Sequence, residues 1–324
     1  MEESIKLNEK DMKLLAYLYH SHREPLTKIA KATGLTREQV EYKIDKFVKE
    51  GVIRKFMTMF NNGAFGYGLY AFMLVKFERF ASKDNFVKKL DGNKNCMSWG
   101  ECSGKYDIFM NLVFRDEKEI QEYLAYLLNE SSEPVADYAL VRPYFSEFHP
   151  LKWFKDGEKD NFPLIFDEVK EKKFDKHEIE MMKMLEKDGR VKLIDISSKL
   201  GISSELALYK MRKLQKDKVI LGSKIHFDMK KLGYNYSGFF VNIKNFSDKT
   251  KNKIIHFARK HKLVNALVLS VTNPNCFIQL FHKTEEELKE TISEFREMLK
   301  DERVDLDIIL LTEENRINTL PFLK

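Results

Sequence analysis

Apolar residues recur with helical spacing in residues 26–56, which carry the clearest hydrophobic pattern of the chain. Val40, Ile44 and Phe47 follow one another at intervals of four and three, so they share one face of a helix. Gly34 falls where a tight turn between two crossing helices favours a residue that is free to adopt positive φ, and Thr36 is a suitable N-cap for the second helix. The pattern therefore predicts a short helix, a glycine turn, a longer helix and then a strand, which is the outline of a winged helix-turn-helix.

An α/β unit follows this motif. Its apolar runs predict strands over 69–77, 97–102, 107–114 and 135–141, with amphipathic helices over 83–90 and 117–128. The order strand–helix–strand–strand–helix–strand is that of the ferredoxin-like, split βαβ fold. Residues 146–173 have no clear period and contain several Pro and Gly positions, so a linker is predicted there.

The whole pattern then repeats at a constant offset. Six landmarks of the second half each follow their counterpart by 167 positions, namely Phe174, Arg190, Gly201, Ser203, Ile220 and Gly233–Tyr234. A constant offset over so many landmarks indicates an internal duplication. The predicted fold class is α+β, with two winged helix-turn-helix domains (1–62 and 174–230), each followed by a ferredoxin-like βαββαβ domain (67–145 and 234–316), and a linker at 146–173.

Composition narrows the function classes. The chain has 324 residues, 43% of them hydrophobic, and a net charge of +6, which is compatible with nucleic-acid binding. Cys96, Cys102 and Cys276 are scattered and form no C-x-x-C pair, which argues against a disulfide framework or a thiolate zinc site. No apolar run is long enough to span a membrane, and the N-terminus has no signal-peptide pattern, so a cytoplasmic protein is expected.

The two halves open with Leu7-Asn8 and Asp11 and with Phe174-Asp175 and Glu178. This opening is similar to the Leu-Asp-x-x-Asp pattern, followed by leucines, of the Lrp/AsnC (feast/famine) family of transcription regulators, which each half resembles. The family arginine before the second helix corresponds to Arg23 and Arg190. The recognition segment is matched by Leu35-Thr36, Gln39-Val40 and Lys43-Ile44, and more loosely by Ile202-Ser203, Leu206-Ala207 and Lys210-Met211. Family members dimerise through the ferredoxin-like (RAM) domain and sense small molecules, often amino acids, so the resemblance implies a tandem, dimer-like regulator in one chain.

A helix that enters the major groove contacts base edges with its N-terminal residues and phosphates with its flanks. The DNA-binding residues expected on this basis are Thr36, Arg37, Gln39, Tyr42, Lys43 and Lys46 in the first copy and Ser203, Ser204, Tyr209, Lys210 and Lys213 in the second. The first helix is neutral overall but has the base-reading side chains of Arg37 and Gln39, whereas the second is basic. We therefore expect the first copy to read sequence and the second to hold phosphate; the alternative is that one copy no longer binds DNA.

The resemblance also implies an effector site. The family has Gly-x-Tyr-Asp at the hairpin between the second and third strands of its ferredoxin-like domain, and Gly104, Tyr106 and Asp107 match it. A glycine there lets the backbone turn tightly and approach a ligand. The alternative is that Gly104 serves only the turn and Asp107 only caps backbone amides. The second copy has Asn273-Pro274-Asn275-Cys276 instead, which puts an effector site there in doubt.

Two other functions compete with the regulator. Siroheme decarboxylases resemble the same tandem architecture, but the His-Asn-Tyr-x-Arg segment of that family corresponds here to Ser103-Gly104-Lys105-Tyr106-Asp107, without its histidine and arginine. The other alternative is a ligand-sensing protein that has lost DNA binding. No catalytic residue, cofactor or metal ligand is predicted, since His256 and His261 have the wrong spacing for one helix face and no nucleotide or acyl-transfer signature is present.

Overall fold

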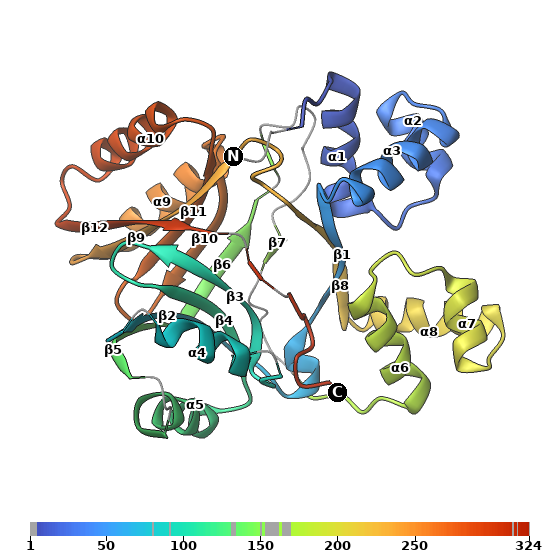
Figure 1. The fold of residues 1–324 in the computed structure, drawn as a ribbon, viewed down its shortest axis with the longest axis horizontal. Helices are drawn as coiled ribbons and strands as arrows, with labels where there is room; N and C mark the ends of the chain where they lie inside the picture. Colours follow the sequence, from blue (N-terminus) through green and yellow to red (C-terminus); the bar gives the residue numbers. More distant parts are fainter. Residues whose placement is uncertain are drawn as a thin grey trace.

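The computed structural model describes residues 5–79, 81–90, 92–130, 134–149, 151–152, 162–163, 170–312, 314–315 and 317–323. Two three-helix units lie on one side of the molecule and a large sheet with its covering helices lies on the other (Figure 1). A two-stranded ribbon lies between the helical units and the sheet.

Each helical unit is a helix-turn-helix preceded by a supporting helix. The first consists of α1 (Glu9–Ser21), α2 (Leu26–Thr33) and α3 (Arg37–Lys49), and the second of α6 (Lys176–Lys187), α7 (Leu193–Leu200) and α8 (Ser204–Lys216). Both predicted turns contain a left-handed glycine after the second helix, since φ is 69° at Gly34 and 65° at Gly201. The glycine turns predicted from sequence are therefore confirmed.

The helix starts are fixed by side-chain caps. Thr36 accepts the backbone N–H of Gln39, whose side-chain oxygen in turn accepts the N–H of Thr36, which is a reciprocal capping box. Asn8 forms the same arrangement at α1 and Asp175 at α6, whereas Ser203 at α8 accepts only the N–H of Leu206. The last cap is not reciprocal because leucine offers no acceptor.

The strand that leaves each helical unit pairs with its counterpart from the other copy. β1 (Ile53–Phe60) and β8 (Ile220–Phe227) are antiparallel, from Ile53 opposite Phe227 to Phe60 opposite Ile220. The wing predicted for each unit is therefore one strand of a ribbon that both copies share. Gly189 packs against this ribbon so closely that a Cβ atom there would lie 2.8 Å from the backbone oxygen of Phe56.

Each ferredoxin-like half has the predicted order of elements. The first contains β2 (Leu69–Phe77), α4 (Ser82–Leu90), β3 (Cys96–Ser103), β4 (Ile108–Phe114), α5 (Glu117–Ala125) and β5 (Val135–Val141); a 3₁₀ turn, Asn62–Phe65, precedes it and a π turn, Tyr126–Glu130, extends α5. The second contains β9 (Asn235–Ile243), α9 (Asp248–Lys260), β10 (Val264–Ser270), β11 (Cys276–His282), α10 (Glu285–Met298) and β12 (Val304–Leu311). The strand orders β5-β2-β4-β3 and β12-β9-β11-β10 are equivalent, as a duplication requires.

The two halves exchange strands. β6 (Pro143–Phe148), which follows the last strand of the first half, pairs with β10 of the second half, and the short β7 (Phe162–Pro163) pairs with β6. Reciprocally, the end of β12 pairs with β3, and Asn315 continues this pairing by a bridge to Trp99. The result is one ten-stranded sheet that contains both halves.

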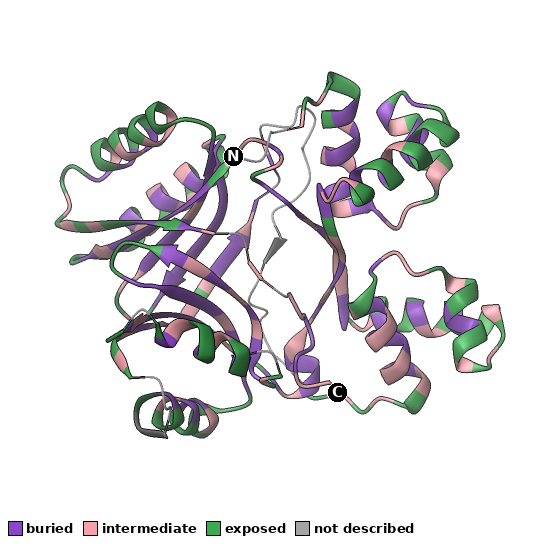
Figure 2. Ribbon diagram, in the orientation of Figure 1, coloured by how far each residue is buried: buried purple, intermediate pink, exposed green. Residues whose placement is uncertain are grey.

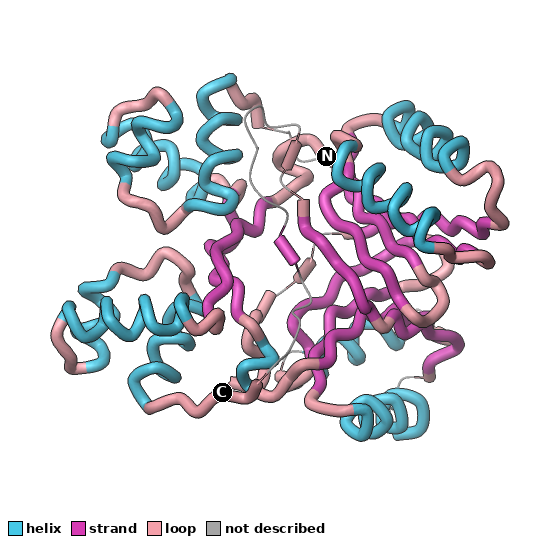
Figure 3. Tube along the Cα trace, turned by 180° about the vertical axis from the view of Figure 1, so that it is seen from behind, coloured by secondary structure: helices cyan, strands magenta, loops and turns pink. Residues whose placement is uncertain are grey.

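The sheet folds so that its two halves face each other (Figures 1 and 3). Phe72 of β2 stacks on Phe240 of β9 and Phe277 of β11, with ring centroids 5.9 and 5.1 Å apart, between the inner faces. Helices α4 and α5 cover the outer face of the first half and α9 and α10 that of the second, each over its own buried cluster. Figure 2 shows the buried residues concentrated in the sheet and the inner helix faces.

The linker predicted at 146–173 starts too early, since its first residues belong to β6. This strand could not be predicted from local sequence, because it is stabilised by pairing with β10, more than a hundred residues away. Most of the rest of that linker lies outside the described residues. At the C-terminus, beyond the predicted boundary at 316, Leu320 is buried in the core of the second helical unit and Phe322 stacks on Tyr67.

Candidate nucleic-acid interface and interior cavity

Helices α3 and α8 each present one exposed face. Their inner faces are buried through Val40, Ile44 and Phe47 and through Ala207, Met211 and Leu214. On the outer faces, Tyr42 is 69% exposed and Tyr209 is 64% exposed. Arg37, Gln39, Lys46 and Lys213 are also exposed, so the outer faces hold many of the polar side chains that the sequence predicts for DNA binding.

The N-terminal residues of both helices are partly committed to capping. The cap of α3 uses the side-chain oxygen of Gln39, which leaves the amide nitrogen as the group that can meet a base. Ser203 is engaged in its own cap, and the Ser204 hydroxyl lies 3.3 Å from that of Ser197 on α7. Arg37 is thus the predicted base-reading residue whose side chain has no part in the cap.

Three of the predicted lysines are paired with acidic residues at the start of the first helix of their own unit, α1 or α6. Lys43 forms an ion pair with Asp11, Lys210 with Asp175, and Lys213 with Glu178 at 2.8 Å. Lys43 and Lys210 occupy equivalent positions and retain only 21% and 12% of their side-chain exposure. These two lysines therefore brace α3 against α1 and α8 against α6.

The DNA-binding residues expected from sequence leave out two basic residues on the outer face of α8, although both contribute to the basic character predicted for this helix. Arg212 and Lys216 are exposed and follow Tyr209 by three and seven positions, so the three share a helix face. The equivalent face of α3 has Asp45 and Lys49 beside Tyr42. Helical periodicity counted from the tyrosine could have identified these residues in the sequence. The two copies differ in charge on this face because Asp45 of α3 corresponds to Arg212 of α8.

The two arginines that precede the second helix of each unit join the copies. Arg23 donates to the carbonyl oxygens of Gly189 and, at 3.3 Å, of Val191 in the other unit. Arg190 lies over the ring of Phe56 on β1, 5.2 Å from its centroid. Burial lowers the pKa of both guanidinium groups, yet both remain charged at any physiological pH. These contacts, with the β1–β8 ribbon, fix one helical unit against the other.

The residues predicted for an effector site have structural partners. The Asp107 carboxylate accepts the backbone N–H of Phe77 at 3.0 Å and the Lys76 ammonium at 2.7 Å. Gly104 has φ of 127°, so the hairpin itself requires a glycine there. Tyr106 is buried in the core, and burial raises its pKa. An effector site at these three residues stays a prediction.

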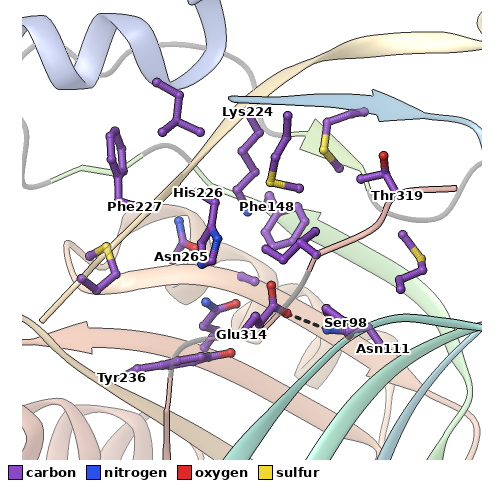
Figure 4. Close-up of a pocket in the computed structure, with 18 of the residues that line it drawn as sticks. Ser98, Asn111, Phe148, Lys224, His226, Phe227, Tyr236, Asn265, Glu314 and Thr319 are labelled. Atoms are coloured by element: carbon purple, nitrogen blue, oxygen red, sulfur yellow. Dashed lines mark hydrogen bonds between the residues drawn. The ribbon is translucent and has the colours of Figure 1, made fainter. Parts of the chain in front are cut away.

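A cavity of about 140 Å³ lies between the β1–β8 ribbon and the inner sheet, and Gly104, Tyr106 and Asp107 do not line it. Met57 and Met59 line it from β1 and Phe148 from the exchanged strand β6. In Figure 4, Lys224 and His226 extend from β8 toward Glu314 and Tyr236 on the opposite side. The sequence offered no signal for this site, because its polar residues come from separate elements and follow no common spacing.

The polar groups of the cavity differ in charge. Glu314 accepts the Asn111 amide at 2.6 Å and a bond from Ser98, yet burial raises the pKa of its carboxyl. Burial, reinforced by Arg54 and Lys224, lowers the pKa of His226 to about 4, so this imidazole is neutral at pH 7. Lys224 Nζ lies 3.5 Å from the ring centroid of Phe148 and 5.6 Å from that of Tyr19. The Lys224 ammonium is thus the prominent charge at this cavity.

Within the described ranges, no helix is long and apolar enough to cross a membrane. The same residues contain no cluster of three or more His, Cys, Asp or Glu side chains that could hold a metal ion.

No family model matches the chain. Among curated proteins, the HTH-type transcriptional regulator FL11 of Pyrococcus abyssi is 31% identical over 123 residues, which cover 37% of this chain and 79% of the relative. FL11 of Pyrococcus horikoshii is 28% identical over 120 residues, with 37% and 79% covered. This chain belongs to the Lrp/AsnC family of helix-turn-helix transcription regulators. Because each relative matches little more than a third of the chain, the matches are consistent with a tandem member of the Lrp/AsnC family.

Among solved structures, the crystal structure of the siroheme decarboxylase NirDL covers 98% of this chain and 96% of its own, with a TM-score of 0.63 and 15% identity. This likeness agrees with a fold in which two copies of a winged-helix and ferredoxin-like pair are joined in tandem. At such low identity the likeness concerns the fold alone.

Proposed function

We propose that this Lrp/AsnC protein is a DNA-binding transcriptional regulator that acts as a single-chain pseudo-dimer. Its two helix-turn-helix units each offer one exposed recognition face, and the shared ribbon holds them in a fixed relation. The observation that carries the proposal is the exposure of Tyr42 and Tyr209 at equivalent positions of α3 and α8. Singly exposed aromatic side chains are common on protein surfaces, but a matched pair at equivalent positions of two recognition helices suits one duplex.

The proposed interface keeps the residues predicted from sequence, with their roles refined. Thr36, Arg37, Gln39, Tyr42 and Lys46 of α3, and Ser203, Ser204, Tyr209 and Lys213 of α8, would face DNA. Lys43 and Lys210 would act by bracing the helices, because their ammonium groups already face carboxylates. Arg212 and Lys216 would supply the phosphate contacts that make α8 the more electrostatic partner.

A siroheme-decarboxylase-like enzyme is the competing proposal, favoured by the NirDL fold likeness over almost the whole chain. A second crystal structure of NirDL is a co-complex with an iron-uroporphyrin III analogue. The interior cavity here, about 140 Å³, is smaller than the roughly 300–1,000 Å³ typical of sites for drug-sized ligands, which argues against a tetrapyrrole. Tetrapyrrole absorbance that copurifies with the chain would support the enzyme instead.

Binding to duplex DNA tests the regulator directly. Genomic fragments would be selected on the purified full chain and the enriched fragments titrated by fluorescence anisotropy at several salt concentrations. The proposal requires affinity that falls linearly on a log–log plot as salt rises, together with a clear preference for the selected fragments over random duplex. Equal affinity for both, or none at low salt, would leave the regulator without support.

A further inference from the structure

We propose that the interior cavity binds a small hydrophobic monocarboxylate, with its carboxylate on the Lys224 ammonium and its hydrocarbon body against the surrounding methionine and phenylalanine side chains. The site is separate from the Gly104–Asp107 hairpin. It is assigned from the residues that line the cavity and from its volume (Figure 4).

Size sets the first limit on the ligand. A dry cavity of about 150 Å³ in another protein accommodates benzene, so a volume of about 140 Å³ suits a ligand with a hydrocarbon body of about six carbons. Met57, Met59 and Met97 line this space, and methionine side chains adapt their rotamers to the shape of a guest. A nucleotide or a tetrapyrrole would not fit without separation of the ribbon from the sheet.

Charge sets the second limit. The Lys224 ammonium sits over the Phe148 ring, and Glu314 interacts with it electrostatically across the cavity, but among the described residues no carboxylate lies within ion-pair distance of Lys224. A cation held against an aromatic face is partly desolvated, and an anionic guest would supply the hydrogen-bond acceptors that the ring does not. The neutral imidazole of His226, on the same strand and face, offers a further donor beside it.

The opposite side of the cavity disfavours an amino acid. Glu314 is already bonded to Asn111 and Ser98 and interacts electrostatically with Lys224, while burial raises the pKa of its carboxyl, so a further ammonium group would compete with partners that are already in place. Asn111 is itself held by the hydroxyl of Tyr70. A ligand that carries only a carboxylate leaves this network unchanged, whereas an α-ammonium group would compete with Asn111 and Ser98 for the oxygens of Glu314.

The position of the cavity gives the ligand a means of regulation, and this part rests on the proposed function. Met57 and Met59 belong to β1, and Lys224 and His226 belong to β8, so the ligand would touch both strands of the ribbon that joins the recognition units. Occupancy would then bias the relative position of α3 and α8 and change the affinity for an operator that needs both helices.

Isothermal titration of the full chain tests the site without DNA. The probes are 4-methylpentanoate, its neutral amide, and L-leucine, which has the same carbon skeleton plus an ammonium group. We expect 4-methylpentanoate to bind at least tenfold more tightly than either of the others. Equal binding of the acid and the amide would overturn the role of Lys224, and tighter binding of L-leucine would overturn the monocarboxylate.

Variants separate the site from general loss of folding. Lys224→Met should weaken 4-methylpentanoate at least tenfold, whereas Lys249→Met, which removes the same charge from an exposed position on α9, should not. Ala266→Leu would fill part of the cavity and should abolish binding, and thermal melts identify any variant that does not fold. Undiminished binding by folded Lys224→Met or Ala266→Leu protein would refute the site.

Anisotropy titration of a selected DNA fragment with and without 4-methylpentanoate then tests the coupling. We expect at least a threefold change in the DNA dissociation constant for the wild type and none for Lys224→Met. Ligand binding without any change in DNA affinity would refute the coupling. If the chain binds no DNA, the proposed regulator function fails, but calorimetry still tests whether the cavity binds 4-methylpentanoate.

Discussion

Tyr42 and Tyr209 lie at equivalent positions of α3 and α8, 167 residues apart, and are exposed to nearly the same extent, 69% and 64%. Both helices bury the opposite face in the core of their own unit. Tyr42→Ala and Tyr209→Ala should each weaken binding to a selected operator about fivefold, as expected for the loss of roughly 1 kcal/mol of contact energy. Anisotropy titrations measure this effect, and unchanged thermal melts serve as the folding control. If either variant binds the operator with wild-type affinity, the helix that carries the substitution is not part of the DNA interface.

The charge difference between Asp45 and Arg212 predicts different roles for the two helices. Arg37→Ala should reduce the preference for the operator over random DNA by about 1–3 kcal/mol, because a bidentate base contact is worth that much. Arg212→Ala should weaken binding to all sequences alike and lower the slope of log affinity against log salt by about 1. An asymmetric operator is expected for the same reason. Equal losses of specificity from the two variants would contradict this division.

Lys218 holds a strained backbone conformation that its counterpart avoids. Its φ is 54°, and the equivalent residue of the first copy is Gly51, with φ of 71°. Left-handed backbone costs an L-residue about 1 kcal/mol relative to glycine. Lys218→Gly should therefore raise the free energy of unfolding by about 0.5–1 kcal/mol, and Gly51→Ala should lower it. Urea denaturation measures both, and a destabilised Lys218→Gly variant would show that the lysine side chain outweighs the strain.

His22 predicts a specific dependence of stability on pH. It is fully buried, its Nε2 lies 3.1 Å from the carbonyl oxygen of Met57, and burial lowers its pKa from 6.5 to about 4. Between these values the unfolded state binds more protons than the folded state, so stability is lost as pH falls from 6.5 toward 4. From pH 7 to pH 5, the wild type should lose about 2 kcal/mol more than His22→Gln.

Urea denaturation at the two pH values tests the role of His22, with His256→Gln, at an exposed site on α9, as the control. The control should follow the wild type. If His22→Gln also follows it, then His22 titrates normally in the folded protein.

Local features of the fold could be predicted from sequence, and long-range ones could not. The caps at Thr36 and Asn8 and the turn at Gly34 depend on neighbouring residues, so their residue types identify them. The duplication was visible as a constant offset. The pairing of β6 with β10 and of β12 with β3 joins segments more than a hundred residues apart, and no periodicity encodes which strand accepts the exchange.

The same distinction holds for the candidate sites. Tyr42 and Tyr209 were predictable because helical periodicity places them opposite the buried face. That Lys43 and Lys210 would pair with acidic residues could not be read from α3 and α8 alone, since the carboxylates lie at the start of α1 and α6. At the cavity, Lys224 of β8 lies close to Phe148 of β6, and Glu314 lies opposite. These three residues come together only when the ribbon packs on the sheet, so no sequence pattern predicts the cluster.

A footprint of the full chain on a selected genomic fragment tests most directly whether both helix-turn-helix units bind one duplex. We predict two protected segments about one helical turn apart, with one requiring more protein for protection in Tyr42→Ala and the other in Tyr209→Ala. A single protected segment that responds to at most one of the two substitutions would contradict the single-chain pseudo-dimer. The absence of any protection at low salt would contradict it as well.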